Sequence, residues 1–449
     1  MNAMRNFFPL SLCHARPSPV NGRGENIESF LSCVAAALFF FFGILQLGLF
    51  NTFSPYLLHD FALDSAELGE LASLYLITIT LIFIPSGILL DRYLTRKPAL
   101  IALFIALVGT FSFALHPTIG TAALYRICAG VGNGLAFLTA MRVANYSFPH
   151  KKALAISLTV SFAMTGGLVA GVPVALLIQH MGWKNTILMD ALLGSVLFCF
   201  MFFCLKNHPD EQHKQHDVTF QKIKAVFKTR QNILCGAFIA GLNLSIYVLA
   251  AVWSNVLLIS HFGLSTGEAA MVSSMIFLGM ILGSPCFGSL SDWMQKRKPA
   301  MRIGGMLALT MMLCITFMPH LTVTTLLCLF FLLGFASSAQ ILSYPTLAES
   351  NPLGLISTAT SMAALIVDIT GALMQFTFGW LLTWHWQGQR VGGVAKYASL
   401  DWHIALSCIV AFLIVSVIAT FILRETHCKA LNIRMSDTDL QYHKKSEES

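Results

Sequence analysis

Apolar residues occur in long runs along this chain, and short polar breaks separate the runs. A membrane-spanning helix needs about 20 mostly apolar residues, because the hydrocarbon core of a bilayer is about 30 Å thick. Only helices can satisfy their own backbone hydrogen bonds across lipid in runs of this length. We therefore predict an all-α integral membrane protein with twelve spans, at 29–53, 67–90, 98–115, 120–146, 152–179, 184–205, 231–259, 267–291, 301–318, 322–348, 354–384 and 401–423.

One polar segment, residues 206–230, divides the spans into two sets of six. Its charge density is higher than that of any other internal segment, and we expect one amphipathic helix in it around Phe220–Phe227. The predicted organisation is an N-terminal tail (1–28), a six-helix bundle (29–205), a linker (206–230), a second six-helix bundle (231–424) and a C-terminal tail (425–449).

Charge is scarce and unevenly placed. Charged residues make up 11% of the chain, against about 25% in soluble domains. If both termini are cytoplasmic, 23 of the 28 Lys and Arg lie on the cytoplasmic side, which is the bias that orients membrane proteins. The net charge of +7 then reflects topology, and nucleic acid is not an expected partner. We predict the cell (inner) membrane as the location, with both termini inside.

The two halves share an internal repeat. At an offset of 201 residues, segment 61–100 matches segment 262–301 at twelve of forty positions without gaps. Both copies contain Gly-x-Leu-x-Asp, then four intervening residues, then Arg-Lys-Pro-Ala, at 87–99 and 288–300. Composition alone does not produce such a frame twice, so the chain is a duplication. Two parallel halves are a known plan of membrane transporters.

These motifs resemble those of the major facilitator superfamily, and the resemblance covers essentially the whole chain. The family's loop motif, Gly-x-Leu-x-Asp-Arg-x-Gly-Arg-Arg/Lys, stands here at 87–97, with Leu94 in place of the usual glycine. A second family pattern, Arg-x3-Gly-x-Gly-x-Gly, begins at Arg126 in the fourth span. The segment from Tyr344 to Pro352, followed by Gly371 and Gly379, is similar to the family's turn between helices 10 and 11.

The resemblance implies two pseudo-symmetric six-helix bundles around a central cavity that opens alternately to each side. Helices 3, 6, 9 and 12 would face lipid. Charged residues at the cytoplasmic ends would then form a gate whose contacts exist in one state only, although the basic ones are equally well explained as topology signals. The gate candidates are Asp91, Arg92, Arg96, Lys97, Arg142, Asp292, Arg297 and Glu349.

Small residues in two spans predict close helix contacts, because glycine lets helix backbones approach in lipid. The candidates are Gly130, Gly132 and Gly134 in the fourth span and Gly167 and Gly171 in the fifth.

Ionisable residues inside spans are costly unless they are paired or wetted, so they point to function. Asp368 lies near the centre of the eleventh span, and Arg126 lies about six residues into the fourth. We predict that Asp368 is a protonatable coupling site and that Arg126 is a fixed positive charge for an anionic substrate group or for Asp368. The alternative is a structural hydrogen bond to a neighbouring helix. Asp190 and Glu70 lie nearer span ends, where we expect them to reach the interface.

Neutral polar residues on otherwise apolar walls are what a substrate pocket needs. With Arg126, the candidates are Gln46, Asn51, Asn243, Tyr247, Gln340, Tyr344 and Gln375.

The leading functional hypothesis is a proton-coupled symporter for a small polar solute, with anionic solutes included. Proton-driven efflux of drugs or metabolites and a non-transporting sensor or assembly protein are the alternatives. No catalytic cluster or nucleotide-binding loop occurs, and the eleven cysteines include no CxxC pair. We therefore expect no enzyme activity, cofactor or metal. The expected partners are the substrate, protons and the lipid bilayer, and the protein is expected to act as a monomer.

Overall fold

The computed structural model describes the chain at residues 22–93, 95–147, 152–207, 229–318, 321–351, 356–384, 386, 390–391, 394–395 and 397–428. Within these ranges, side chains are described except at 22–27, 84, 87–88, 91–93, 145–146, 152–157, 357, 390–391 and 394–395. The amphipathic helix expected around Phe220–Phe227 lies outside the described residues.

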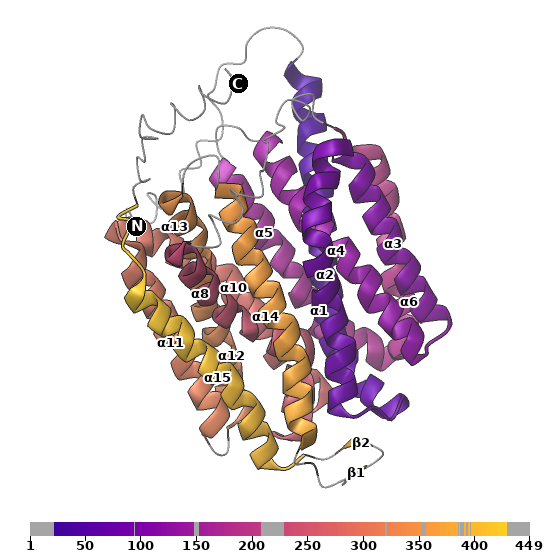
Figure 1. Ribbon diagram of the computed structural model, residues 1–449. Coiled ribbons are helices and arrows are strands. Elements are labelled where there is room, and N and C mark those ends of the chain that lie inside the picture. Colours follow the sequence, from indigo (N-terminus) through magenta and orange to yellow (C-terminus); the bar gives the residue numbers. More distant parts are fainter. Residues whose placement is uncertain are drawn as a thin grey trace, which may run out of the picture.

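The first half consists of long helices joined by short turns (Figure 1). Its elements are α1 (Gly22–Asp60), α2 (Ser65–Tyr93), α3 (Arg96–Leu115), α4 (Ile119–Ser147), α5 (Lys152–Ala170) and α6 (Val172–Cys204).

The second half repeats this plan with more interruptions. Its elements are α8 (Arg230–Leu244), the π-helix η3 (Ser245–Trp253), α9 (Ser254–Ser260), α10 (Thr266–Met294), α11 (Arg297–Phe317), α12 (Val323–Ser337), the 3₁₀-helix η4 (Ser338–Leu342), α13 (Ser343–Ser350), α14 (Ile356–Trp384) and α15 (Ser399–Ile422). A two-stranded antiparallel hairpin, β1 (Arg390–Val391) with β2 (Val394–Ala395), precedes α15. The fold is therefore α-helical as predicted, apart from this small hairpin.

Eleven continuous helical stretches are long and apolar enough to cross a membrane, counted over the described residues. One of them, Leu158–Cys204, is 47 residues long and holds two spans. It bends at Gly182, whose φ of 80° lies in the left-handed region that glycine adopts without steric strain. The twelve predicted spans are consistent with this arrangement.

The two ends of the bundle differ in charge. We call the end that carries the α2–α3 and α10–α11 turns, with Arg96 and Arg297, the basic end. The opposite end, where α1 and α9 finish and the β-hairpin lies, is called the hairpin end (Figure 1). In the predicted orientation the basic end faces the cytoplasm.

The sequence repeat is also a structural repeat. Helices α2 and α10 have 29 residues each and begin 201 residues apart, and α3 and α11 begin at the same offset. Both α2 and α10 start with a reciprocal cap. The Glu67 carboxylate accepts from Asp64 N and Asp64 Oδ1 accepts from Glu67 N, while Ser265 and Glu268 form the same pair in the second half. Such caps fix helix starts through local sequence.

Two spans of the second half contain irregular turns near their middle. The seventh span passes through the π-helix η3, and the tenth passes through the 3₁₀-helix η4. The two turns touch, since the hydroxyls of Ser245 and Ser337 are 2.6 Å apart. Irregular backbone inside a membrane is tolerated where the protein itself satisfies the freed groups, and π-turns are frequent at functional sites.

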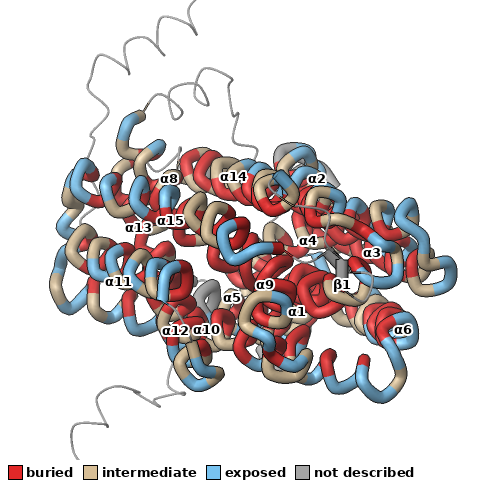
Figure 2. Tube along the Cα trace, turned by 90° about the horizontal axis from the view of Figure 1, so that it is seen from below, coloured by how far each residue is buried: buried red, intermediate tan, exposed pale blue. Residues whose placement is uncertain are grey.

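The rim of the bundle is apolar and exposed, as a lipid-facing surface must be. Figure 2 shows exposed residues along α3, α6 and α11 and buried residues around α1 and α9 in the middle of the bundle. Exposed large apolar side chains include Phe104 on α3, Val196 on α6, Met306 on α11 and Val415 on α15. These helices are the third, sixth, ninth and twelfth spans, which the family resemblance placed toward lipid.

Candidate functional site

Arg126 is wholly buried in the first half. Its Nη2 donates to the carbonyl of Ala72 at 2.9 Å, and its guanidinium lies between the rings of Phe50 and Tyr75, 4.3 and 4.4 Å from their centroids. Both rings attract a cation through their π faces. The other two nitrogens, Nε and Nη1, have no partner among the described residues. A buried charge is therefore held in place with two donors unused.

Asp368 is buried in the second half and is anchored by Tyr247. The Tyr247 hydroxyl donates to Asp368 Oδ1 at 3.0 Å. The carbonyl of Tyr247, which belongs to the π-helix, accepts from Gln375 Nε2 at 2.6 Å. Asp368 and Gln375 are two turns apart on α14 and so share a face. Asp368 thus contacts the hydroxyl of Tyr247, and Gln375 contacts its backbone carbonyl.

Gly371 lies between these two anchors and makes the arrangement possible. A Cβ atom at Gly371 would collide with the Tyr247 ring and would lie 2.8 Å from Leu76 Cδ1 of α2. Only glycine lets the ring lie this close to α14. The sequence had singled out Gly371 as part of a family turn, and the structure shows what the missing side chain allows.

Tyr75 connects the two halves of the site. It stacks on Arg126, its hydroxyl donates to the carbonyl of Gly43 at 2.9 Å, and it lies in the electrostatic field of both Arg126 and Asp368. The neighbouring Leu76 touches α14 beside Gly371. Tyr75 was absent from the sequence-based candidates, because an aromatic residue in an apolar span gives no polar signal.

The remaining candidates of the second half are Tyr344, Asn243 and Gln340. Tyr344 is half-buried and lies in the field of Asp368. Asn243 is half-buried one turn before Tyr247, and its Oδ1 has no partner among the described residues. Gln340, in η4, is buried with Oε1 likewise unpaired.

Gln46 and Asp190 form a separate buried network. Gln46 Nε2 donates to Asp190 Oδ2 at 2.6 Å, and the Tyr125 hydroxyl donates to Gln46 Oε1 at 2.7 Å. The expectation that Asp190 reaches the interface is wrong, since its side chain is buried at 7% exposure. It points into the bundle, where α1 and α4 supply its partners.

Asn51 ties the two halves together. Its Nδ2 donates to the hydroxyls of Ser254 and Ser273 at 2.9 and 2.7 Å, and its Oδ1 accepts from Asn255 N at 3.1 Å. Ser54, one turn further along α1, donates to the carbonyl of Val252. These residues form what we call the Asn51 clamp.

Two other contacts close the hairpin end. At the start of α2, Ser65 N donates to the Tyr397 hydroxyl at 3.0 Å, and a Cβ atom at Gly69 would lie 2.7 Å from the Gln375 carbonyl. In the fifth span, a Cβ atom at Gly167 or Gly171 would collide with α10, at Phe277 and Ser274 respectively. Every hydrogen bond between described residues of opposite halves lies toward this end.

The basic end of the second half holds an ion-pair network. Arg297 Nη2 and Nη1 lie 2.8 and 2.9 Å from Glu349 Oε1 and Asp292 Oδ1. The carboxylate of Glu425 accepts from the backbone N–H groups of Arg297 and Lys298 at 2.7 and 3.0 Å. Burial opposes the charged form of Glu425, but these backbone bonds outweigh it and hold its pKa below the ordinary value.

The other gate candidates have different surroundings. Arg96 Nη2 donates to the Phe202 carbonyl at 2.6 Å and stacks on the Phe202 ring, within its own half. Lys97 is exposed, and Arg142 is half-buried with a partner of its own. The side chains of Asp91 and Arg92 lie outside the described residues.

The glycines of α4 lie against neighbouring helices of their own half. A Cβ atom would lie 2.6 Å from the Tyr75 carbonyl at Gly130, 2.9 Å from Ala106 Cβ at Gly132 and 3.1 Å from Ile82 at Gly134.

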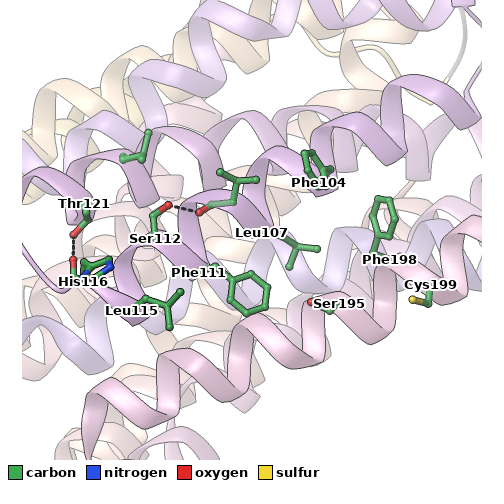
Figure 3. Close-up of a pocket in the computed structure, with 12 residues that line it drawn as sticks. Phe104, Leu107, Phe111, Ser112, Leu115, His116, Thr121, Ser195, Phe198 and Cys199 are labelled. Carbon is green, nitrogen blue, oxygen red and sulfur yellow. Dashed lines mark hydrogen bonds between the residues drawn. The ribbon is translucent and has the colours of Figure 1, made fainter.

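A groove of about 670 Å³ lies elsewhere, between α3, α4 and α6 (Figure 3). Its walls are mainly apolar, including Phe104, Phe111 and Phe198, and its serine and threonine hydroxyls bond to backbone carbonyls of their own segments. None of the predicted site residues lines it. The described residues also contain no group of three His, Cys, Asp or Glu that could hold a metal ion.

Comparisons with known proteins agree with this architecture. The sequence profile of the Major Facilitator Superfamily matches residues 36–375. The chain therefore belongs to the Major Facilitator Superfamily, a family of membrane transporters rather than enzymes.

Individual relatives are distant. The riboflavin transporter RibZ of Clostridioides difficile (strain 630) is 23% identical over 180 residues, which are 40% of each chain. A hexuronate transporter of Bacillus subtilis (strain 168) is 25% identical over 256 residues, 54% of this chain and 60% of that protein. The match thus spans about half the length of these relatives.

A solved structure shares the fold across nearly the whole chain. It is a bacterial homologue of the human lysosomal transporter Spinster, in an inward-facing, unoccupied conformation. Its TM-score is 0.72 at 16% identity, over 89% of this chain and 96% of that one.

Proposed function

We propose that this chain is a secondary active transporter that moves a small polar solute with an anionic group across the cell membrane. In this proposal the solute crosses by alternating access and in symport with protons. The protein acts as a monomer, and the basic end faces the cytoplasm.

The observation that carries the proposal is the pair of unused donors on Arg126. A buried donor without a partner costs about 1–3 kcal/mol, and more when it is charged. Carboxylates and phosphates accept strong, charge-assisted hydrogen bonds from a guanidinium. A substrate anion that reaches Arg126 relieves this cost, whereas an uncharged analogue does so only in part.

Asp368 is the proposed proton carrier. It is buried in a span, and no Lys, Arg or His of the described residues lies within salt-bridge distance of it. A lone carboxylate inside a membrane is costly, so it is suited to bind a proton before its half moves. Tyr247 holds the carboxyl group in place and is itself held by Gln375, and Tyr75 stacks on Arg126.

The Asn51 clamp and the glycine contacts indicate which state this is. The halves meet at the hairpin end, so the opposite, basic end is the one proposed to be open. A substrate would leave or enter there in the proposed orientation. To open the hairpin end instead, the Asn51 clamp must break and the basic ends of the two halves must meet.

The first test is the thermal unfolding of the detergent-purified chain with glucuronate or with glucose, at pH 5.5 and pH 7.5. These sugars differ by one carboxylate, and a hexuronate is the solute named for one relative. A ligand at 100 times its dissociation constant stabilises the state that binds it by about 2.7 kcal/mol. We expect glucuronate alone to stabilise. Equal effects of the two sugars would contradict an anion site at Arg126.

The second test addresses protons. In proteoliposomes with an imposed proton gradient, the wild type is expected to accumulate labelled glucuronate, and Asp368→Asn is expected to exchange it without accumulating it. Accumulation by Asp368→Asn at the wild-type level would reject Asp368 as the carrier.

A second candidate function is proton-driven efflux of a larger metabolite or drug. The aromatic rings of Phe50 and Tyr75 beside Arg126 favour it, because they suit a planar apolar ligand as well as a cation. Riboflavin, the solute named for another relative, is the probe for this candidate in the same unfolding assay.

A further inference from the structure

The proposed transport cycle makes no use of the buried carboxyl group of Asp190 on α6. Gln46 donates to its Oδ2, Tyr125 donates to Gln46, and Oδ1 has no partner among the described residues. The group is as buried as Asp368 and belongs to the other half.

Asp190 has no compensating charge among the side chains that the structure describes. The elements packed against α6 are α1, α3, α5 and α10. None of their described cationic side chains lies within salt-bridge distance of the carboxyl group, and of the titratable side chains only Tyr125, on α4, connects to it. On α6 itself, His180 and Lys184 are exposed on either side of the bend at Gly182. The charged and titratable residues of α1, α3, α5 and α10 lie toward helix ends: Arg23, Glu25, Glu28, Tyr56, His59, Asp60, Arg96, Lys97, Lys152, Glu268 and Asp292.

Two opposing effects act on this carboxyl group. An isolated ionised carboxylate in an apolar interior is so costly that such groups usually stay neutral. Against this, the chain from the Tyr125 hydroxyl through the Gln46 amide directs its donors toward Asp190, and donors in series strengthen one another. This network suits a group that changes its charge during a cycle.

Helix α1 connects Asp190 to the parts that move. Gln46 bonds to Asp190, Phe50 lies against Arg126, and Asn51 forms the clamp to the second half. These three residues lie within six positions of one helix. When the clamp opens, α1 shifts, and the hydrogen bond from Gln46 to Asp190 shifts with it.

We propose that Asp190 is a second proton-binding site of this transporter, separate from Asp368 and controlled by the position of α1. The proton is bound on Oδ1, because Oδ2 accepts the Gln46 N–H. On release the Oδ1–H bond breaks, the proton goes to water, and the carboxylate keeps the electron pair. The inference rests on the alternating access of the proposed function, but its first test needs no substrate.

The test is an infrared difference titration of the full chain in lipid, because a protonated carboxyl group has its own C=O band. Wild type, Asp190→Asn, Asp368→Asn and the double variant are compared as pH is changed. We expect the wild type to show two titrating carboxyl bands, each single variant to lose a different one, and the double variant to lose both. If Asp190→Asn leaves the titrating bands unchanged, the second site is rejected. A missing Asp368 band rejects the proposed coupling site instead.

Gln46→Leu supplies an independent readout if Asp190→Asn fails to fold. Loss of the Gln46 donor is expected to move the Asp190 band to higher frequency and to leave the Asp368 band in place. Gln340→Leu, a matched change of a buried glutamine in the other half, is the control and is expected to leave the Asp190 band unmoved. An unmoved band in Gln46→Leu overturns the assignment.

The link through α1 has its own test. Asn51→Ala is expected to change the protonated fraction of Asp190 at fixed pH, and an unchanged fraction would reject control by α1.

Discussion

The two halves have the same scaffold but different polar interiors. Helices α2 and α10 begin with equivalent caps, 201 residues apart, and α3 and α11 begin at the same offset. The buried charges do not repeat, since the position equivalent to Arg126 is apolar, around Leu327, and aligning the eleventh span on the fifth places Met164 opposite Asp368. The duplication therefore supplied two similar frames, and each frame received its own ionisable group. The helix caps that both halves share serve folding, whereas the buried charges that they do not share are candidates for function.

The state of the two buried charges also differs. In the second half, Asp368 is anchored by a tyrosine that is itself held by Gln375. In the first half, Arg126 is fixed by aromatic rings and one carbonyl, with donors left over. In the proposed function, Arg126 of the first half binds the ligand anion and Asp368 of the second half binds a proton. Substitutions in each half test this difference.

The largest effect is expected from Arg126→Leu. Removing a charged hydrogen-bond partner from a buried site costs about 2–5 kcal/mol of binding, so glucuronate should bind at least about 30-fold more weakly. The fold should be retained, because the substitution also removes an under-satisfied buried charge. Titration of the thermal shift with glucuronate measures the loss. Wild-type affinity in this variant would end the assignment of Arg126 to the substrate.

A large loss of stability is expected from Arg297→Gln. Breaking a buried ion pair costs about 3–5 kcal/mol, because the remaining charge is left unpaired, and Arg297 contacts both Glu349 and Asp292. The matched control is Arg96→Gln at the equivalent position of the first half, where the guanidinium bonds to a carbonyl instead. Thermal unfolding compares the two variants. Equal losses of stability in the two variants would show that the ion pair of Arg297 is not the cause of the loss.

A moderate effect is expected from Gly371→Ala. The new Cβ collides with Tyr247 and pushes the tyrosine from Asp368, at an overpacking cost of about 1–3 kcal/mol. Gly288→Ala is the control, because a Cβ there meets nothing within 4 Å and alanine favours the helix. Unfolding and proton-driven uptake are measured for both. Normal uptake by Gly371→Ala would show that Tyr247 need not be held in place.

A smaller shift is expected from Asn51→Ala. Loss of the clamp bonds should favour opening of the hairpin end by about 1.4 kcal/mol, a factor of about ten in the balance of states. Hydrogen–deuterium exchange at the start of α10 should rise accordingly. Asn185→Ala is the control, since Asn185 bonds only within its own helix, to the Met181 carbonyl. Unchanged exchange in Asn51→Ala would reject the clamp.

The smallest effect is expected from Glu425→Gln and depends on pH. The pKa of Glu425 is below its ordinary value of 4.5, so its charged form stabilises the fold. That contribution is present above the ordinary value and disappears as pH falls through the lower folded value. The difference in Tm between wild type and variant should thus be constant near neutral pH and vanish in acid. A difference independent of pH would contradict this origin.

The sequence alone determined the helical spans, their number, the duplication and the family. The length of an apolar run predicts a membrane span, capping residues predict where a helix starts, and a repeated motif indicates duplication. Each of these signals can be read from the sequence without knowledge of tertiary contacts. It also selected Arg126 and Asp368, because a charge in an apolar span is conspicuous without any knowledge of its neighbours.

Only the tertiary structure decided which polar residues meet. Asn51 and Gln46 look alike as polar residues of one span, yet one reaches the second half and the other reaches Asp190. The π-helix η3, which presents the Tyr247 carbonyl to Gln375, contains no glycine or proline from which it could have been predicted. The roles of these residues depend on groups from distant helices, and the pairing of helices within a bundle is set by packing rather than by local sequence.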